Sequence, residues 1–305
     1  PATAVAARSQ VSPAHTRPRS RNFGLSLVNT GNRPPHTAGE VETAVEVARR
    51  GGLALDNARL YGRQLKVAET LQRSLLTPPP RTDDLDIAVR YRPASRHTLV
   101  GGDFYDAFLQ PDGAMLLVVG DVVGHSVDAT AAMSELRSTV RALAYDHGNG
   151  PGATLQRTDR ALTGLGFGTL ATVLVASLEQ PPPSGAVRRW VLRWSSAGHP
   201  PPLLLREQGG VEVLDRPAEL LLGTGIPTGR SDHLLDLRLG DTVVLYTDGL
   251  LEHQRTGIDE GLRRLSAVLA GLAGRSAAEV CDAVLDQVVT GSADDDVALL
   301  VVRPR

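Results

Sequence analysis

Residues 115–125 read MLLVVGDVVGH, an apolar run that ends at Asp121 and passes into a turn containing glycine and histidine. A short run of β-branched and large apolar residues bounded by turn residues is typical of a buried β-strand. A side chain at the end of such a strand is rigidly held and still reachable by solvent. The stretch therefore predicts a buried strand that presents a carboxylate at its end.

The same arrangement of an acid beside an apolar strand recurs in three distant segments. These are Asp103 in VGGDFYD, Asp248 in VVLYTDG, and the run Asp294, Asp295 and Asp296 in front of VALLVV. A single aspartate beside glycine is most often a turn residue, as we expect for Asp112 and Asp241. Four segments with an acid at a strand end instead indicate that folding brings these carboxylates together.

Carboxylates gathered from separate strands repel one another, and this raises their pKa values unless a cation neutralises them. Oxygen ligands, with water in the remaining positions, suit Mg²⁺ or Mn²⁺, and the sequence contains no set of cysteines and histidines for zinc. Two such ions roughly 3.5 to 4 Å apart would hold a bridging hydroxide and the oxygens of a phosphate, so that attack occurs in line. The acids therefore predict hydrolysis of a phosphate ester without a covalent enzyme intermediate.

The composition excludes several other classes of function. The 305 residues are 42% hydrophobic and 22% charged, which excludes a fully disordered or fibrous chain. Lys66 is the only lysine and lies in no phosphate-binding glycine loop, so a Walker-type nucleotide hydrolase is excluded. Cys281 is the only cysteine, which rules out an intrachain disulfide and a multi-cysteine zinc site.

The charge balance and the hydropathy pattern bear on partners and location. The 32 basic and 34 acidic side chains create no global field that would attract nucleic acid or anionic lipid. No apolar run reaches the roughly 18 to 20 residues needed to cross a bilayer. We therefore expect a cytoplasmic protein with no nucleic-acid and no membrane partner.

The pattern divides the chain into three parts. Residues 1–22 lack an apolar signal core and predict a disordered leader. Residues 23–80 contain a short strand at 24–29 and then a long helix, which begins with a capping box from Thr37 to Glu40 and ends before three prolines. Residues 81–305 change to short strands mixed with helices.

The long helix carries apolar residues at coiled-coil spacing. Leu53, Leu60 and Val67 are seven residues apart, which allows the helix to pair with its twin in a parallel coiled coil. A glycine pair and two polar residues interrupt the heptads. Two alternatives follow, a homodimer through this helix and a helix that folds back on its own domain.

The last part of the chain predicts a layered α+β domain. Strands are expected at 87–92, 115–123, 170–178, 190–195, 202–206, 233–239, 242–249 and 297–303. Helices are expected at 127–146, 153–162, 261–273 and 277–289. Strands in two groups, with helices in pairs, predict sheets inside and helices outside.

Six ordered blocks of this part resemble the metal-dependent serine/threonine phosphatases of the protein phosphatase 2C (PPM) type, in the branch of the sporulation stage II protein E phosphatase. The blocks are GGDFYDAF, GDVVGHSVDATAAM, SSAGHPPPLLL, LLLGTGIP, VVLYTDGLLE and DDDVALLVVR. The resemblance covers about Leu76 to Arg303 and implies a four-layer β-sandwich flanked by helix pairs. The stretch 29–61 resembles the tail of a GAF sensory domain, and VAETLQRSLLTPPP resembles the linker helix that follows such domains.

The resemblance implies a role for each acid. Asp121 would bridge two Mn²⁺ or Mg²⁺ ions while the Val122 carbonyl binds one of them. Asp248 and Asp295 would complete the shell of the second ion, and Asp103 would orient metal-bound water or hold a further ion. Asp295 is preferred because it lies three residues before Ala298, which occupies the threonine position of the family pattern. The neighbouring aspartates of the run are the alternatives in that register.

Three further positions near these motifs leave their roles open. His125 and His199 are candidates for the general acid that protonates the leaving oxygen, and the alternative is that they form hydrogen bonds that fix the glycine turns. Glu252 is a candidate to aid metal-bound water or to cap the next element. Ser126 replaces the usual glycine of the family, which is harmless if its φ is negative and strains the turn if its φ is positive.

The leading hypothesis is a phosphoserine/phosphothreonine protein phosphatase controlled by the long helix. By the resemblance, its substrate would be a phosphorylated anti-sigma factor antagonist. One alternative is a diguanylate cyclase, because GGDFYD partly matches the GG-D/E-E-F loop, but it leaves the other acids unexplained. The other is a catalytically weak or inactive scaffold that binds a phosphoprotein without cleaving it, an alternative that rests on Ser126.

Overall fold

The computed structural model describes residues 36–75, 77–93, 101–124, 127–181, 189–251, 257–289 and 295–305. The expected leader at 1–22 and the expected strand at 24–29 lie outside the described residues, as do His125, Ser126, Glu252 and Asp294. The chain divides into two compact units, Pro1–Val67 and Ala68–Arg305. Within the described ranges, we find no helix with the length and apolarity that a bilayer crossing requires.

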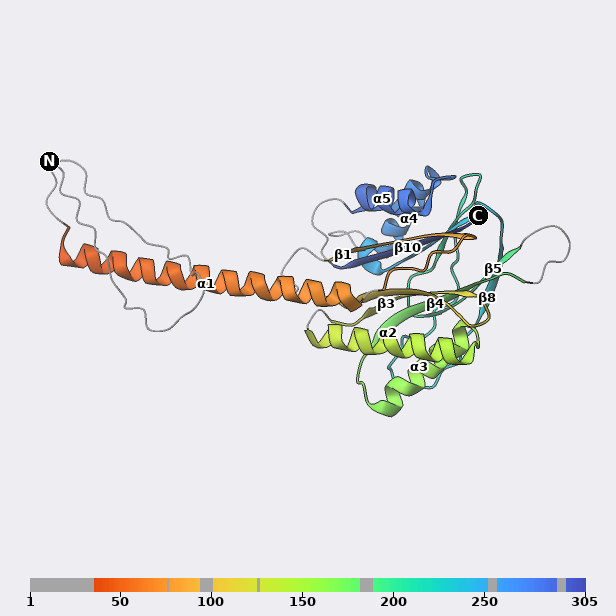
Figure 1. Cartoon of the computed structure of the whole chain (residues 1–305), viewed down its shortest axis with the longest axis horizontal. Coiled ribbons are helices and arrows are strands. Elements are labelled where there is room, and N and C mark those ends of the chain that lie inside the picture. Colours follow the sequence, from red (N-terminus) through yellow and green to blue (C-terminus); the bar gives the residue numbers. More distant parts are fainter. Residues whose placement is uncertain are drawn as a thin grey trace. The chain divides into compact units, whose positions relative to one another are not determined.

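The long helix expected from the sequence is α1, Ala38–Leu75, one continuous helix in Figure 1. Its start has the expected capping box, in which Thr37 N–H donates to Glu40 Oε2 at 2.8 Å and Glu40 N–H donates to Thr37 Oγ1 at 3.3 Å. These two bonds satisfy backbone donors that the first turn leaves without helical partners. Leu53 and Leu60 are exposed on this helix.

Two five-stranded antiparallel sheets form the centre of the second unit. The first sheet has the strand order β1-β10-β9-β6-β7 and the second has the order β2-β3-β4-β5-β8. The strands are β1 (Leu85–Arg92), β2 (Asp103–Leu109), β3 (Met115–Val122), β4 (Ala171–Glu179), β5 (Trp190–Ala197), β6 (Leu203–Leu205), β7 (Val211–Val213), β8 (His233–Leu237), β9 (Thr242–Tyr246) and β10 (Val297–Pro304).

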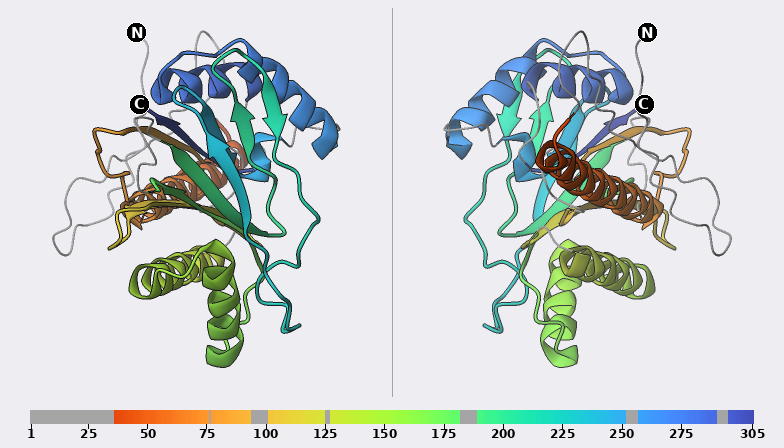
Figure 2. Two further views of the ribbon diagram at one scale, coloured as in Figure 1. Left: turned by 90° about the vertical axis from the view of Figure 1, so that its right-hand side faces the viewer. Right: turned by 90° about the vertical axis from the view of Figure 1, so that its left-hand side faces the viewer.

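A pair of helices covers the outer face of each sheet, so the unit has four layers (Figure 2). Helices α4 and α5 pack on the first sheet, and α2 and α3 pack on the second. Their bounds are α2 (Val127–His147), α3 (Pro151–Leu165), α4 (Ile258–Ala270) and α5 (Ala277–Val288). The α+β sandwich flanked by helix pairs that the sequence predicts is therefore confirmed.

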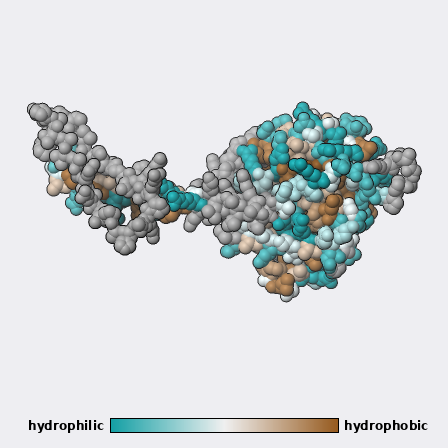
Figure 3. Space-filling view, in the orientation of Figure 1, coloured by the Kyte–Doolittle hydropathy of each residue, from teal (hydrophilic) through white to brown (hydrophobic). Residues whose placement is uncertain are grey.

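The central strands read as continuous apolar runs because both of their faces are buried. Neighbouring residues on β3, such as Val118 and Val119, point to opposite faces, and both are buried. One face packs against the other sheet and one against helices, so alternation of apolar and polar residues is absent. The visible surface of this unit is mostly hydrophilic, with separate apolar patches (Figure 3).

Two strands were missed by the sequence analysis, β2 and β7. Strand β2 pairs with β3 from Asp103 opposite Asp121 to Leu109 opposite Met115. Its sequence, DFYDAFL, contains two aspartates, a residue type that is depleted in strands, and this hides the strand pattern. The expected strand at 242–249 ends earlier, at Tyr246, and a short 3₁₀-helix, Asp248–Leu250, follows it.

The second aspartate of β2, Asp106, is buried and held by two arginines of α2. Arg137 Nη1 lies 3.1 Å from Asp106 Oδ2, and Arg141 Nη1 lies 2.6 Å from Asp106 Oδ1. The Ala107 N–H also donates to Oδ1 at 2.9 Å. Removal of one partner from such a buried ion pair is strongly destabilising, because it leaves a charge without compensation. The ion pairs therefore fix α2 to β2, beside the acids at the strand ends.

Candidate metal centre

The structure brings three of the expected ligands together. Asp103, Asp121 and Asp248 each place one carboxylate oxygen within 4.8 Å of the other two. Asp103 begins β2 and Asp121 lies near the end of β3, both in the second sheet, whereas Asp248 follows β9 of the first sheet. The cluster therefore lies where the two sheets meet. Oxygen donors alone, arranged in this way, fit a hard divalent cation.

Antiparallel pairing explains why Asp103 and Asp121 are neighbours. The two residues are directly opposite in the β2–β3 register. Side chains of directly opposite residues lie on the same face of a sheet, with their Cβ atoms roughly 4.5 to 5.5 Å apart. Two aspartates that are far apart in the sequence thus become a fixed pair, which the apolar packing of β3 holds in place.

Glycines allow the backbone to approach these acids closely. A Cβ at Gly102 would lie 2.1 Å from the Val122 carbonyl oxygen, and a Cβ at Gly101 would lie 1.1 Å from Asp296 Oδ2. A Cβ at Gly249 would lie 2.0 Å from the Asp296 carbonyl oxygen. A side chain at Gly102 or Gly249 would collide with a backbone carbonyl, so only glycine fits beside Asp103 and Asp248.

A buried hydroxyl orients Asp103 across the two sheets. Thr247 Oγ1 donates to Asp103 Oδ2 at 2.6 Å and accepts the N–H of Ala298 at 2.8 Å. By contrast, Asp248 Oδ1 is buried without a hydrogen-bond partner within the described part of the chain. A buried oxygen of this kind is costly unless something pairs with it, and a bound cation would do so. The residues present therefore fit a metal ion.

The three carboxylates have raised pKa values. Burial, followed by the charges of Asp248 and Asp295, raises the pKa of Asp121 to about 7. Burial and the charge of Asp121 raise the pKa of Asp103 well above its usual range, and burial raises that of Asp248. At neutral pH full ionisation of the three carboxylates is therefore unfavourable, and the uptake of protons or cations would relieve it.

The two described members of the aspartate run differ in position. Asp295 is exposed and lies outside the group of three, although its charge contributes to the raised pKa of Asp121. Asp295 Oδ1 accepts the N–H of Asp296 at 2.8 Å. Asp296 is only 2% exposed, and the Tyr91 hydroxyl donates to its Oδ2 at 2.6 Å.

Sequence reasoning missed Tyr91 and Thr247 as residues that touch the site acids. Thr247 lies directly before Asp248, so its position in the motif was an available signal. Tyr91 lies 205 residues from Asp296 in the sequence, and no motif joins them. Only the pairing of β1 with β10 brings the two residues together.

His199 is held in a structural network. Its Nε2 lies 3.0 Å from the Tyr246 carbonyl oxygen, and its Nδ1 lies 2.9 Å from Thr172 Oγ1. A carbonyl only accepts, so Nε2 carries the proton and Nδ1 accepts from the threonine hydroxyl. Burial lowers the pKa of His199 to about 4. The geometry favours hydrogen bonding over the general-acid role for this histidine.

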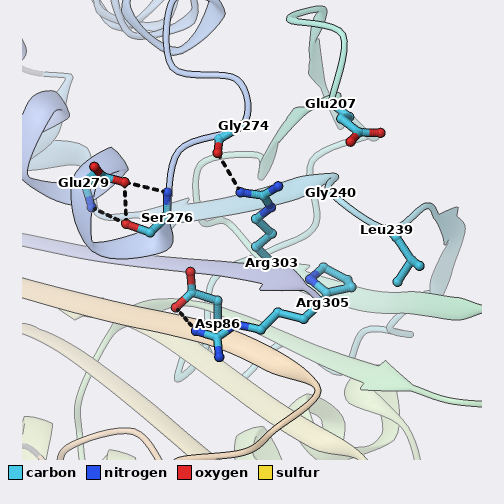
Figure 4. Close-up of a pocket in the computed structure, with 10 residues that line it drawn as sticks. Asp86, Glu207, Leu239, Gly240, Gly274, Ser276, Glu279, Arg303 and Arg305 are labelled. Atoms are coloured by element: carbon cyan, nitrogen blue, oxygen red, sulfur yellow. Dashed lines mark hydrogen bonds and ion pairs between the residues drawn. The ribbon is translucent and has the colours of Figure 1, made fainter.

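A hollow elsewhere in the second unit does not include the acids of the cluster. It has a volume of about 640 Å³. Figure 4 shows its lining residues, which are Asp86, Glu207, Leu239, Gly240, Gly274, Ser276, Glu279, Arg303, Pro304 and Arg305. Its arginines are occupied, because Arg303 Nη1 donates to the Gly274 carbonyl at 3.0 Å and Arg305 Nη2 donates to Asp86 Oδ1 at 3.0 Å. The cluster of three carboxylates, which is not part of the lining of this hollow, is therefore the candidate site.

Comparison with known proteins gives one family and a set of similar folds. The family model of stage II sporulation protein E matches residues 111–305. The RsbU and RsbW domains of a Mycobacterium tuberculosis protein are 31% identical, with a TM-score of 0.66, over 75% of this chain and 62% of that chain. This chain therefore spans less than two thirds of that protein's solved chain.

Two further solved structures show likeness of fold. The phosphatase domain of SpoIIE from Bacillus subtilis, with a fragment of its regulatory domain, is 16% identical with a TM-score of 0.58, over 74% of this chain and 64% of that chain. The catalytic domain of the serine/threonine protein phosphatase PstP, in complex with 2 manganese ions, is 17% identical with a TM-score of 0.52, over 72% of this chain and 98% of that chain.

We expect Asp121→Asn to stabilise the metal-free protein at pH 7.5. The native state raises the pKa of Asp121 from 3.8 to about 7. Its contribution to stability is therefore complete below about pH 4 and is lost as the pH rises through 7. The amide carries no charge, so the variant should gain about 1 to 2 kcal/mol in unfolding free energy. Urea unfolding in EDTA between pH 5 and 8 measures this gain.

Asp112→Asn is the matched control, because Asp112 is an exposed turn residue whose Oδ1 accepts the Ala114 N–H at 3.0 Å. An asparagine can keep that hydrogen bond, so this variant should follow the wild-type pH profile. The expectation fails if Asp121→Asn and the wild type lose stability in parallel as the pH rises.

Proposed function

The chain belongs to the stage II sporulation protein E family, and on that premise we propose that it is a metal-dependent phosphoserine/phosphothreonine protein phosphatase. The observation that supports this most is the cluster of Asp103, Asp121 and Asp248, whose acidic oxygens converge from two sheets. The partnerless oxygen of Asp248 within the described chain supports it further. Similarity of fold to the manganese-bound PstP domain agrees with the same chemistry.

The proposed cofactor is a pair of Mn²⁺ or Mg²⁺ ions. In this proposal Asp121 would serve both ions and the Val122 carbonyl one of them, Asp248 and Asp295 would complete the shell of the second ion, and Asp103 would orient water or hold a further ion. When bound, such a pair supplies an activated water as nucleophile and neutralises the charge on the phosphoryl oxygens. Without that neutralisation, the carboxylate cluster would repel a phosphate dianion.

The residues of this chain have distinct tasks in this proposal. Thr247 keeps Asp103 at the sheet junction, and the neighbouring glycines leave the space that the acids occupy. His199 stays neutral at physiological pH, because burial lowers its pKa to about 4, and it ties β4 to β9 through its two hydrogen bonds. His125 remains a candidate general acid and lies outside the described residues.

We propose that the substrate is a phosphorylated protein, specifically an anti-sigma factor antagonist, as the family resemblance implies. Two exposed apolar residues near the acids, Val123 and Leu170, support a protein substrate, and we call them the apolar rim. Val123 is 63% exposed and Leu170 is 42% exposed, and the Val123 N–H donates to the Leu170 carbonyl at 2.9 Å. Two exposed apolar residues on hydrogen-bonded backbone segments suit contact with a protein surface.

The domain boundaries and the dimer belong to the same proposal. Residues 81–305 would form the phosphatase domain, and residues 23–80 would form the tail of a sensory domain with its linker helix. We propose that α1 pairs with its twin in a homodimer, because Leu53 and Leu60 are exposed at heptad spacing. A sensory signal would then reach the phosphatase domain through this helix.

We expect the wild-type chain to hydrolyse para-nitrophenyl phosphate with Mn²⁺, and Asp248→Asn to lose at least about 100-fold in rate, because one ligand oxygen of the pair loses its charge. EDTA should abolish turnover, and Asp112→Asn should keep the wild-type rate. Equal rates in the wild type, with EDTA and in Asp248→Asn would refute the phosphatase. Binding of a phosphoprotein without turnover by the wild type would favour the inactive scaffold.

Leu170→Gln separates a protein substrate from a small ester. The substitution removes an exposed apolar contact and keeps the backbone carbonyl that receives Val123 N–H. We expect kcat/KM for a phosphorylated anti-sigma factor antagonist to fall about tenfold, which corresponds to about 1.4 kcal/mol. Turnover of para-nitrophenyl phosphate should stay within about twofold of the wild type. An equal loss on both substrates would argue against a docking role for this rim.

Leu60→Pro tests the linker helix. A proline inside a helix removes a backbone hydrogen bond and clashes with the preceding turn, at a cost of about 3 kcal/mol or more. Sedimentation should show a dimer for the wild type and a monomer for the variant, while Mn²⁺ binding is retained. Leu55→Ala, at an exposed position off the heptad spacing, should remain dimeric. A monomeric wild type would refute the dimer, and loss of folding by Leu60→Pro would argue against a separable linker.

A further inference from the structure

The hydrogen bond between Tyr91 and Asp296 lies beside the metal centre without belonging to the group of three carboxylates. The Tyr91 hydroxyl donates to Asp296 Oδ2 at 2.6 Å. Tyr91 lies on β1 directly opposite Ala298 of β10, two residues past Asp296. A hydroxyl that donates to a buried carboxylate forms a short, charge-assisted bond, which is stronger than a neutral one.

Asp296 contacts the segments on both sides of the cluster. Its Oδ2 occupies the place that a Cβ would take at Gly101, two residues before Asp103. Its carbonyl oxygen lies only 2.0 Å from the place that a Cβ would take at Gly249, directly after Asp248. A shift of Asp296 would therefore be transmitted to both turns, because neither has free space around it.

Asp296 is also tied to its exposed neighbour. The Asp296 N–H donates to Asp295 Oδ1 at 2.8 Å, so the backbone position of one aspartate sets the carboxylate position of the other. A connected series of contacts thus runs from the Tyr91 hydroxyl to Asp296, and from there to Asp295 and to the turn that carries Asp248.

We propose that Tyr91 is a positioning residue for the metal ligands Asp248 and Asp295, and that it acts by fixing Asp296. The inference rests on the proposed function, in which these aspartates bind Mn²⁺ or Mg²⁺. The charges of Asp103 and Asp121 repel the Asp296 carboxylate, and the Tyr91 hydroxyl opposes its displacement by donating to it. Partners that orient ligands in this way typically change metal affinity 10- to 100-fold when they are removed.

The test is isothermal titration of the metal-free full chain with Mn²⁺. Tyr91→Phe removes only the hydroxyl, and we expect it to weaken Mn²⁺ binding at one site by about tenfold or more. Tyr246→Phe is the matched control, because Tyr246 is also buried and its hydroxyl donates to the Pro201 carbonyl at 2.9 Å and not to a carboxylate. It should lower the melting temperature in EDTA about as much as Tyr91→Phe and keep the wild-type Mn²⁺ affinity.

A second pair of variants keeps the test decisive if Tyr91→Phe fails to fold. Asp296→Asn retains an acceptor oxygen for the Tyr91 hydroxyl, whereas Asp296→Ala removes it. We expect Mn²⁺ affinity to be higher in the asparagine variant than in the alanine variant. Equal Mn²⁺ affinity in these two variants would overturn the positioning role.

The outcomes separate this inference from the proposed function. A wild-type chain that takes up no Mn²⁺ would refute the metal-dependent phosphatase itself. Mn²⁺ uptake by the wild type, together with unchanged affinity in Tyr91→Phe, would refute only the role of Tyr91. An equal loss of Mn²⁺ affinity in Tyr91→Phe and Tyr246→Phe would also refute the role of Tyr91, because the loss would then follow from lower stability of the fold.

Discussion

Mutual repulsion of three carboxylates at the junction of two sheets is the constraint on which this structure depends. Acidic oxygens within 4.8 Å of one another, largely removed from water, favour separation of the strands that carry them. The sandwich opposes that separation, because β3 and β10 are buried on both faces by the opposite sheet and by helices. The apolar layers thus hold charges at a spacing that the charges themselves disfavour, and the uptake of a cation would relieve this repulsion.

Much of this architecture follows from local sequence patterns. Apolar runs such as MLLVVGD and VALLVV predict their strands correctly, because full burial leaves no polar alternation to confuse the pattern. The aspartates at the strand ends were predicted as a cluster for the same reason, since strand ends place side chains at defined positions. The assignment of individual ions to these acids, and of the first residues to a sensory-domain tail, stays a prediction.

Other features depend on contacts that no local pattern encodes. Strand β2 reads as polar because its Asp106 receives its neutralising partners, Arg137 and Arg141, from a helix that follows later in the chain. The bond from Tyr91 to Asp296 spans 205 residues and exists only because β1 and β10 are paired. Sequence reasoning finds the acids of such a site more readily than the neutral groups that hold them.

The two aspartates of β2 have different partners, and only one of them belongs to the cluster of three carboxylates. Asp106 is bound by two guanidinium groups, which cancel its charge and leave nothing for a cation to gain. Asp103, three residues earlier, receives the hydroxyl of Thr247. A hydroxyl fixes the orientation of a carboxylate but leaves its charge in place, whereas an arginine in the same position would compete with a metal ion. The hydroxyls of Thr247 and Tyr91 are neutral donors of this kind, so they fix their aspartates without supplying a positive charge in place of a metal ion.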